Sequence, residues 1–188
     1  EAVGNRGYMS WDQIKEVEKE SFAYIGNHSH SHDYLTKFTF QKFVEDIEQS
    51  IKIFKNKLGY NPIFFSYPFG EYNLEQKNYI SNNFEFAFGQ HSGVIDLNKD
   101  RYELPRFPIN EKYGEIKRFK EVISYLPLQY RIIKPENKFM NDEENPPKMT
   151  IEFFQDQKNL ELAVRLREQT EQSEKANTKL WNYLRRLK

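Results

Sequence analysis

The feature that most constrains the fold is the alternation of short apolar runs with amphipathic stretches. Residues 62–66 and 85–89 are apolar runs of strand length, and residues 74–82 between them have the pattern of a short helix. A strand, a helix and a second strand in this order predict a parallel crossover, because parallel strands need a long connection. The chain is therefore predicted to be an α/β protein.

Two further helices have clear sequence signals. Residues 40–58 carry apolar side chains at three- and four-residue steps, and Gly59 then offers a left-handed C-terminal cap. Ser10 followed by Gln13 has the pattern of a capping box, so a helix is predicted over residues 11–21.

The remaining elements of the predicted α/β domain are shorter. Residues 22–26 are apolar enough for a short buried strand, and residues 103–108 should be extended because each of two prolines fixes its own φ. Residues 115–126 are amphipathic and predicted to be helical. Residues 129–133 are expected to close the sheet.

The chain changes character after residue 135, where the first domain (1–135) should end. Residues 136–148 are polar and read as a linker. Residues 149–159 begin with an alternating pattern, which predicts a remnant strand of an accessory domain. Residues 160–188 are highly charged and predicted to form a long C-terminal helix, either solvated or docked on a partner groove or a bilayer surface.

Composition narrows the possible partners. The charges balance, with 28 Lys and Arg against 28 Asp and Glu, so no overall field attracts nucleic acid or an anionic membrane. The absence of cysteine excludes thiolate metal sites and leaves His, Asp and Glu as ligands. No stretch approaches the length of a membrane span. We therefore expect a neutral or locally recognised partner, no nucleic acid and no membrane span.

A cluster of histidines follows directly after the predicted strand at residues 22–26. His28, His30 and His32 alternate with serines, and neutral imidazole is the commonest metal ligand in proteins. We expect His28 and His32 to converge on one ion while His30 faces away. The alternative is a polar loop that happens to be rich in histidine.

Two motifs in order carry a family resemblance. The sequence reads Gly26-Asn27-His28-Ser29-His30-Ser31-His32 and, after the long predicted helix, Pro68-Phe69-Gly70. This order resembles the NodB-homology polysaccharide deacetylases, carbohydrate esterase family 4, and especially their poly-N-acetylglucosamine deacetylase branch. The resemblance covers roughly residues 8–135 and implies a partial deformed (β/α) barrel, followed by the linker, one strand and the long C-terminal helix.

The resemblance also implies an activity and a site. It implies hydrolysis of N-acetyl groups on a polysaccharide with a divalent metal, zinc first, and His28 and His32 as two of three ligands. The backbone N–H of Phe69 would donate to the oxyanion, and Tyr67, Pro68 and Tyr72 would line the substrate groove. The alternative for Tyr67 is packing in the core. The family further suggests an extracytoplasmic or cell-envelope location.

Several residues depart from the family pattern. No strand ending in paired aspartates precedes the histidines within residues 1–27, so the barrel is expected to lack its opening strand and helix. Ser66 stands where many members carry an arginine, a role that Arg106 could take unless it pairs with a surface acid. His91 is a candidate acid or base, or a loop histidine bonded to backbone, and Asp33 is a weaker candidate base or ligand.

Two classes of function therefore remain open. The first is a metal-dependent deacetylase for which this chain is incomplete. The second is a non-catalytic relative that binds glycan, or an interaction module that acts through the C-terminal helix.

Overall fold

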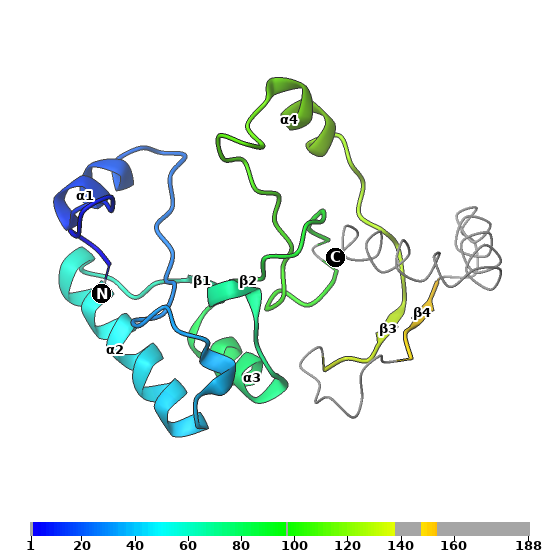
Figure 1. The fold of residues 1–188 in the computed structure, drawn as a ribbon, viewed down its shortest axis with the longest axis horizontal. Coiled ribbons are helices and arrows are strands. Elements are labelled where there is room, and N and C mark those ends of the chain that lie inside the picture. The colour runs from blue at the N-terminus through cyan, green and yellow to red at the C-terminus, as the bar shows by residue number, and fades with distance from the viewer. Residues whose placement is uncertain (1, 97, 138–147, 154–188) are drawn as a thin grey trace. The chain divides into compact units, whose positions relative to one another are not determined.

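The computed structural model describes residues 2–96, 98–137 and 148–153 (Figure 1). The chain forms two compact units. The first contains Glu1–Gln90 and Leu97–Leu104, and the second contains His91–Asp96 and Pro105–Lys188. The two units are taken in turn below.

The first unit is built on a small parallel sheet. Strands β1 (Phe64–Ser66) and β2 (Phe86–Phe88) pair in parallel and are connected by helix α3 (Leu74–Asn83). Single-residue bridges extend the sheet on both sides, from Asn27 to Phe65 and from Leu104 to Phe88. The predicted crossover and the α/β class are therefore confirmed, whereas the barrel stays a prediction.

The predicted buried strand at residues 22–26 is wrong. Phe22 is 80% exposed and Tyr24 is 74% exposed. Pairing with β1 begins only at Asn27, whose N–H donates to the Phe64 carbonyl at 2.8 Å. The residues before it form no ladder with any described strand, so their apolar side chains are left outside the core.

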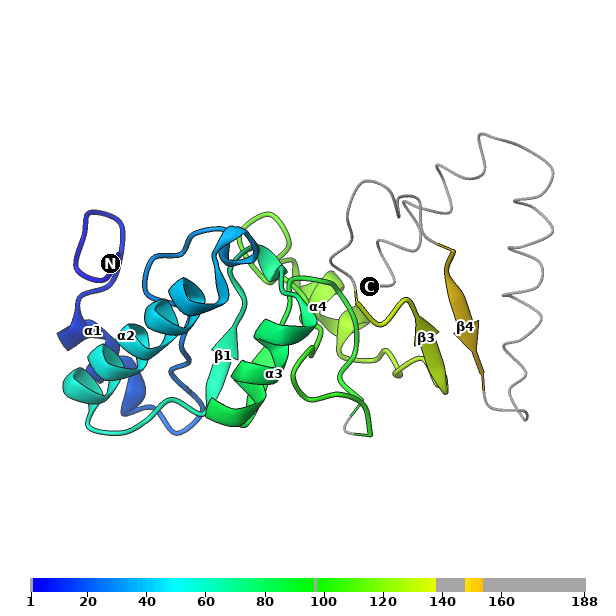
Figure 2. The same cartoon turned by 90° about the horizontal axis from the view of Figure 1, so that it is seen from below.

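The helices of the first unit follow their local signals. Helix α1 (Trp11–Glu18) starts with the predicted capping box, in which Ser10 and Gln13 bond reciprocally. Helix α2 (Phe40–Leu58) has the predicted bounds and ends at Gly59, whose φ is 91°. A 3-10 turn, η1 (Leu35–Lys37), precedes it. Figure 2 shows α2 and α3 beside β1, and they enclose a core of Leu35, Phe43, Ile47, Phe65, Tyr67, Tyr72, Ile80, Phe84 and Ala87.

The second unit contains helix α4 (Ile116–Val122) and a two-stranded antiparallel sheet. Strand β3 (Ile132–Lys134) pairs with β4 (Thr150–Glu152), so the prediction that residues 129–133 close the parallel sheet is wrong. The physical reason is the alternation in β4: Ile151 is half-buried between two exposed residues and lies opposite Ile133.

Several predictions concern residues outside the described part of the chain. The C-terminal helix at residues 160–188 and most of the linker are among them. The predicted domain boundaries stay predictions. None of the helices that the structure describes is long and apolar enough to cross a membrane.

Candidate functional site

The structure brings His28 and His32 together. His28 directly follows the bridge residue Asn27 at the edge of the sheet. The ring centroids of the two histidines are 4.8 Å apart with an angle of 75° between the planes. This proximity is what a shared ion requires of two ligands.

The first of these rings is held in a defined orientation. His28 Nδ1 lies 2.6 Å from the Ser66 carbonyl oxygen at the end of β1. A carbonyl oxygen can only accept, so Nδ1 carries the hydrogen, and the neutral ring then has its lone pair on Nε2. Such a backbone hydrogen bond is the usual means by which proteins orient a metal-binding histidine.

Buried acceptors hold the loop between the two histidines. The carboxylate of Asp46, which is buried on α2, accepts the backbone N–H groups of His30 and Ser31, each at 2.9 Å. Asn27 Oδ1 accepts the N–H of Ser29 at 2.9 Å. Asp46 was not predicted from the sequence, although a carboxylate three residues after Phe43 on the apolar stripe of the helix is a usable signal.

Backbone strain is concentrated at the same place. Ser29, His32 and Phe69 have φ values of 67°, 57° and 58°, the left-handed conformation that residues other than glycine rarely adopt. Each costs about 1–2 kcal/mol, and such strain typically persists at functional sites where the surroundings over-determine it.

The Phe69 turn lies against the histidines. Turn η2 (Pro68–Gly70) follows β1 and places the Phe69 ring 5.1 Å from the ring of His32. Tyr34 stacks on Phe69 at 4.0 Å, with only 5° between the planes. We call His28, His32, Phe69 and Tyr34 the His–aromatic cluster. Tyr34 was missed in the sequence, where nothing distinguishes it from the other exposed aromatic residues.

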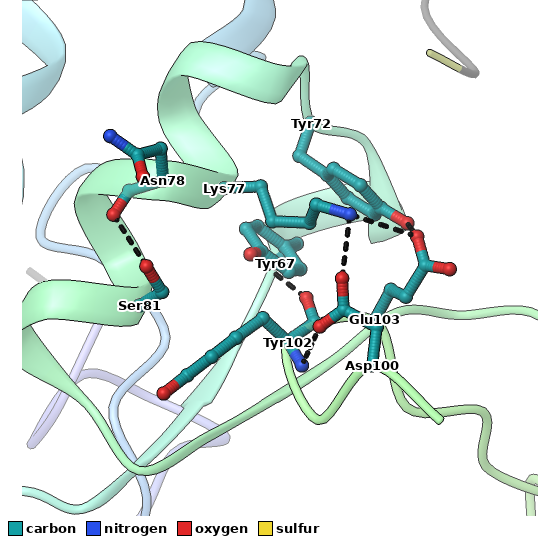
Figure 3. Close-up of polar contacts among 8 residues, drawn as sticks. All are labelled: Tyr67, Tyr72, Lys77, Asn78, Ser81, Asp100, Tyr102 and Glu103. Carbon is teal, nitrogen blue, oxygen red and sulfur yellow. Dashed lines mark hydrogen bonds and ion pairs between the residues drawn. The ribbon is translucent and has the colours of Figure 1, made fainter. Parts of the chain in front are cut away.

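Tyr67 and Tyr72 lie under the turn instead of on its surface. They are 1% and 7% exposed, and their ring centroids are 4.4 Å apart (Figure 3). Tyr67 donates to the Tyr102 carbonyl at 3.1 Å, and Tyr72 donates to Glu103 at 2.8 Å. Their contacts support the turn from inside the core, and a role in lining the groove stays a prediction.

An ion-pair network extends from these tyrosines. Lys77 Nζ lies 2.7 Å from Asp100 and 3.5 Å from Glu103 (Figure 3). Burial raises the pKa of both Tyr67 and Tyr72 above the ordinary value, and the nearby carboxylates of Asp100 and Glu103 make a smaller contribution in the same direction. Burial by itself would lower the pKa of Lys77, but the bonds and charges of Asp100 and Glu103 outweigh it and raise that pKa.

The other predicted site residues lie in different surroundings. Pro68 is buried in η2. Asp33 is exposed, and its N–H donates to the Ser31 hydroxyl at 3.2 Å. His91 and Arg106 belong to the second unit, where the Arg106 N–H donates to the His91 carbonyl at 3.0 Å. The catalytic and orienting roles of these side chains stay predictions.

The fit to a metal ion is partial. The described residues contain no group of three or more His, Cys, Asp or Glu side chains that could hold an ion. Catalytic zinc usually takes three protein ligands and keeps one open position. His28 and His32 can supply two of the three, so the residues that the structure describes do not form a complete site.

Comparison with known proteins finds a family model that matches part of the chain. Residues 2–86, which include the whole His–aromatic cluster, match the sequence profile of the family described as polysaccharide deacetylase. The match covers the residues that carry both motifs and agrees with the family that these motifs predicted. No curated protein matches the sequence significantly.

Solved structures share the fold at low identity. A polysaccharide deacetylase from Bacillus cereus has a TM-score of 0.57 at 21% identity, over 65% of this chain and 39% of its own. The deacetylase PplD of Streptococcus pyogenes, in complex with acetate, has a TM-score of 0.58 at 17% identity, over 65% of this chain and 54% of its own. IcaB from Ammonifex degensii has a TM-score of 0.54 at 20% identity, over 66% of this chain and 58% of its own. The chain thus spans about two fifths to three fifths of these proteins.

Proposed function

We propose that the chain is part of a metal-dependent hydrolase that removes N-acetyl groups from a polysaccharide. The observation that carries the proposal is the pairing of His28 and His32 beside the Phe69 turn, within the stretch that matches the family. A divalent ion, with zinc as the first candidate, would polarise the amide carbonyl and activate a water molecule when bound.

The residues of the chain would divide the remaining work. His28 and His32 would bind the ion, and the Ser66 carbonyl would keep the His28 ring in its orientation. The backbone N–H of Phe69 would donate to the oxyanion that forms when the amide is attacked. Tyr34 would act as a positioning residue, because its ring covers one face of Phe69.

A third ligand and a base must complete this chemistry. Asp33 and His91 are the candidates from this sequence, and the family resemblance places the principal carboxylates in a strand upstream of the histidines. Because ion, base and oxyanion donor act together, we expect the 188-residue chain alone to release acetate poorly.

Metal uptake tests the histidine pair directly. We expect the 188-residue chain to bind cobalt, followed by its visible absorption, and we expect His28→Ala or His32→Ala to abolish this binding. His30→Ala is the matched control and should bind as the parent does. Equal loss in all three variants would mean adventitious chelation by a histidine-rich loop and would reject the metal site.

Acetate release tests the reaction itself. N-acetylglucosamine oligomers are incubated with the chain and with a longer protein that adds an upstream strand carrying the carboxylates, and acetate is measured enzymatically. We expect strong release only from the longer protein. Strong release by the 188-residue chain would show that one of its own side chains acts as the base. Asp33→Asn and His91→Gln would then identify that side chain.

A second candidate function is glycan binding without catalysis. The observation that favours it is the lack of a third metal ligand among the residues that the structure describes. Binding of the oligomers by the longer protein without metal uptake or acetate release would select this alternative. The proposed interaction role of residues 160–188 lies outside the described part of the chain.

A further inference from the structure

The second unit contains a hollow that the proposed reaction does not use. It has a volume of about 570 Å³, within the range of small-molecule sites in proteins. Its walls are formed by Ser92, by the segment at Phe107 and by helix α4 with the residues that flank this helix. All of these residues belong to the second unit.

Contacts within the unit build these walls. Arg118 Nη1 donates to the carbonyls of Pro108 and Tyr113 at 2.9 and 3.3 Å, so this guanidinium ties α4 to the segment before it. A side chain on Gly93 would place its Cβ 3.0 Å from Pro105, so the loop that carries Ser92 is closely packed on the extended segment. The hollow is therefore a feature of the packed unit.

The lining combines flat rings with balanced charge. The rings of Phe107 and Tyr125 meet edge to face at 6.0 Å, and Tyr125 is 51% exposed. Glu115 and Glu121 line the hollow together with Lys117 and Arg118, so the lining contains two acidic and two basic side chains. A lining without net charge offers no field to an ion, but it offers many hydrogen-bond donors and acceptors to a ligand rich in hydroxyl groups.

We propose that this hollow is a second binding site for a neutral, N-acetylated oligosaccharide. The ring of Tyr125 would contact the apolar face of a sugar, and Glu121 and Lys117 would bond to its hydroxyl groups. The choice of an N-acetylated sugar over other neutral polyols rests on the proposed function.

Nuclear magnetic resonance titration of the full chain with an N-acetylglucosamine oligomer tests this. We expect amide shifts at Ser92, Phe107 and α4, and about tenfold weaker binding after Tyr125→Ala. Glu121→Gln should also weaken binding. The matched controls are Tyr24→Ala and Glu111→Gln, on exposed residues that do not line the hollow, and both should bind as the parent does.

Two probe ligands of opposite charge make the result decisive. A glucosamine oligomer, which is cationic, and an oligogalacturonate, which is anionic, should each bind more weakly than the neutral oligomer. Binding of either that equals or exceeds it would overturn the proposal, as would unchanged affinity in Tyr125→Ala with its circular dichroism preserved.

The outcome is separable from that of the proposed function. The double variant His28→Ala, His32→Ala should lose cobalt uptake and still bind the oligomer in the hollow. If no protein form releases acetate but these shifts persist, the deacetylase proposal fails and the second site stands. If acetate is released and the hollow shows no shifts, the second site is rejected and the deacetylase stands.

Discussion

Replacement of Tyr72 by phenylalanine tests the buried network beneath the Phe69 turn. The Tyr72 hydroxyl donates to Glu103 at 2.8 Å, and the residue is 7% exposed. The substitution keeps the ring but removes this bond to a charged acceptor. We expect Tyr72→Phe to lower the free energy of unfolding at neutral pH by about 2 kcal/mol, because Glu103 loses a buried donor while Lys77 remains near it.

The pH dependence gives a sharper test. Burial raises the pKa of Tyr72 above its ordinary value of 10.0, so the hydroxyl ionises in the unfolded chain first. Its contribution to stability is then complete below pH 10 and is lost as the pH rises toward the folded-state pKa. Each such tyrosine lowers the free energy of unfolding by about 1.4 kcal/mol per pH unit in that range. Tyr67 and Lys77 act in the same direction, since their pKa values are also raised.

Urea unfolding followed by circular dichroism, from neutral pH to about pH 11.5, measures both effects. The parent should lose stability steeply above pH 10, and Tyr72→Phe should show a slope shallower by about 1.4 kcal/mol per pH unit. Tyr8→Phe, on an exposed ring, is the control and should leave the neutral-pH value unchanged. An equal alkaline slope in parent and variant would refute the argument from burial.

Three further substitutions test the His–aromatic cluster and its support. Asp46→Ala leaves two backbone N–H groups without their acceptor, so it should lower the free energy of unfolding, measured in urea, by about 2–4 kcal/mol and weaken cobalt uptake. A variant that binds cobalt as tightly as the parent would contradict this role. Gly70→Ala should cost at least about 2 kcal/mol, because φ is 72° and the new Cβ would lie 2.5 Å from the Gln90 nitrogen. In the longer protein, Tyr34→Ala should lower the rate of acetate release about tenfold, and Tyr34→Phe should keep the rate of the parent. Equal rates in the parent and Tyr34→Ala would exclude Tyr34 as a positioning residue.

Local signals predicted where the helices lie, although α1 ends at Glu18 instead of residue 21 and α4 covers only Ile116–Val122 of the predicted 115–126. The bounds of α2 follow from its apolar periodicity and from Gly59, and the start of α1 follows from the capping box at Ser10. These features depend on residues within a few positions of one another, and the interactions that produce them are therefore visible in the sequence. The parallel crossover was predictable for a related reason, since a helix between two apolar runs favours that topology.

Long-range pairing was less predictable. Residues 22–26 are apolar but pair with no strand among the described residues, and β3 pairs with β4 instead of the parallel sheet. Apolar character shows that a segment can be buried, but it does not show which segment will cover it. The choice of partner depends on the positions of elements that are far apart in the chain.

The candidate site divides in the same way. The sequence by itself determined that His28 and His32 are spaced as metal ligands and that a Pro-Phe-Gly turn follows β1, because residue type and spacing are properties of the chain. Only the tertiary structure decided that the Phe69 ring meets His32, that Tyr34 stacks on Phe69, and that Asp46 holds the loop. These contacts join separate elements. Helix α2 brings the buried Asp46 carboxylate to the loop between the histidines, and η2 after β1 brings Phe69 against His32.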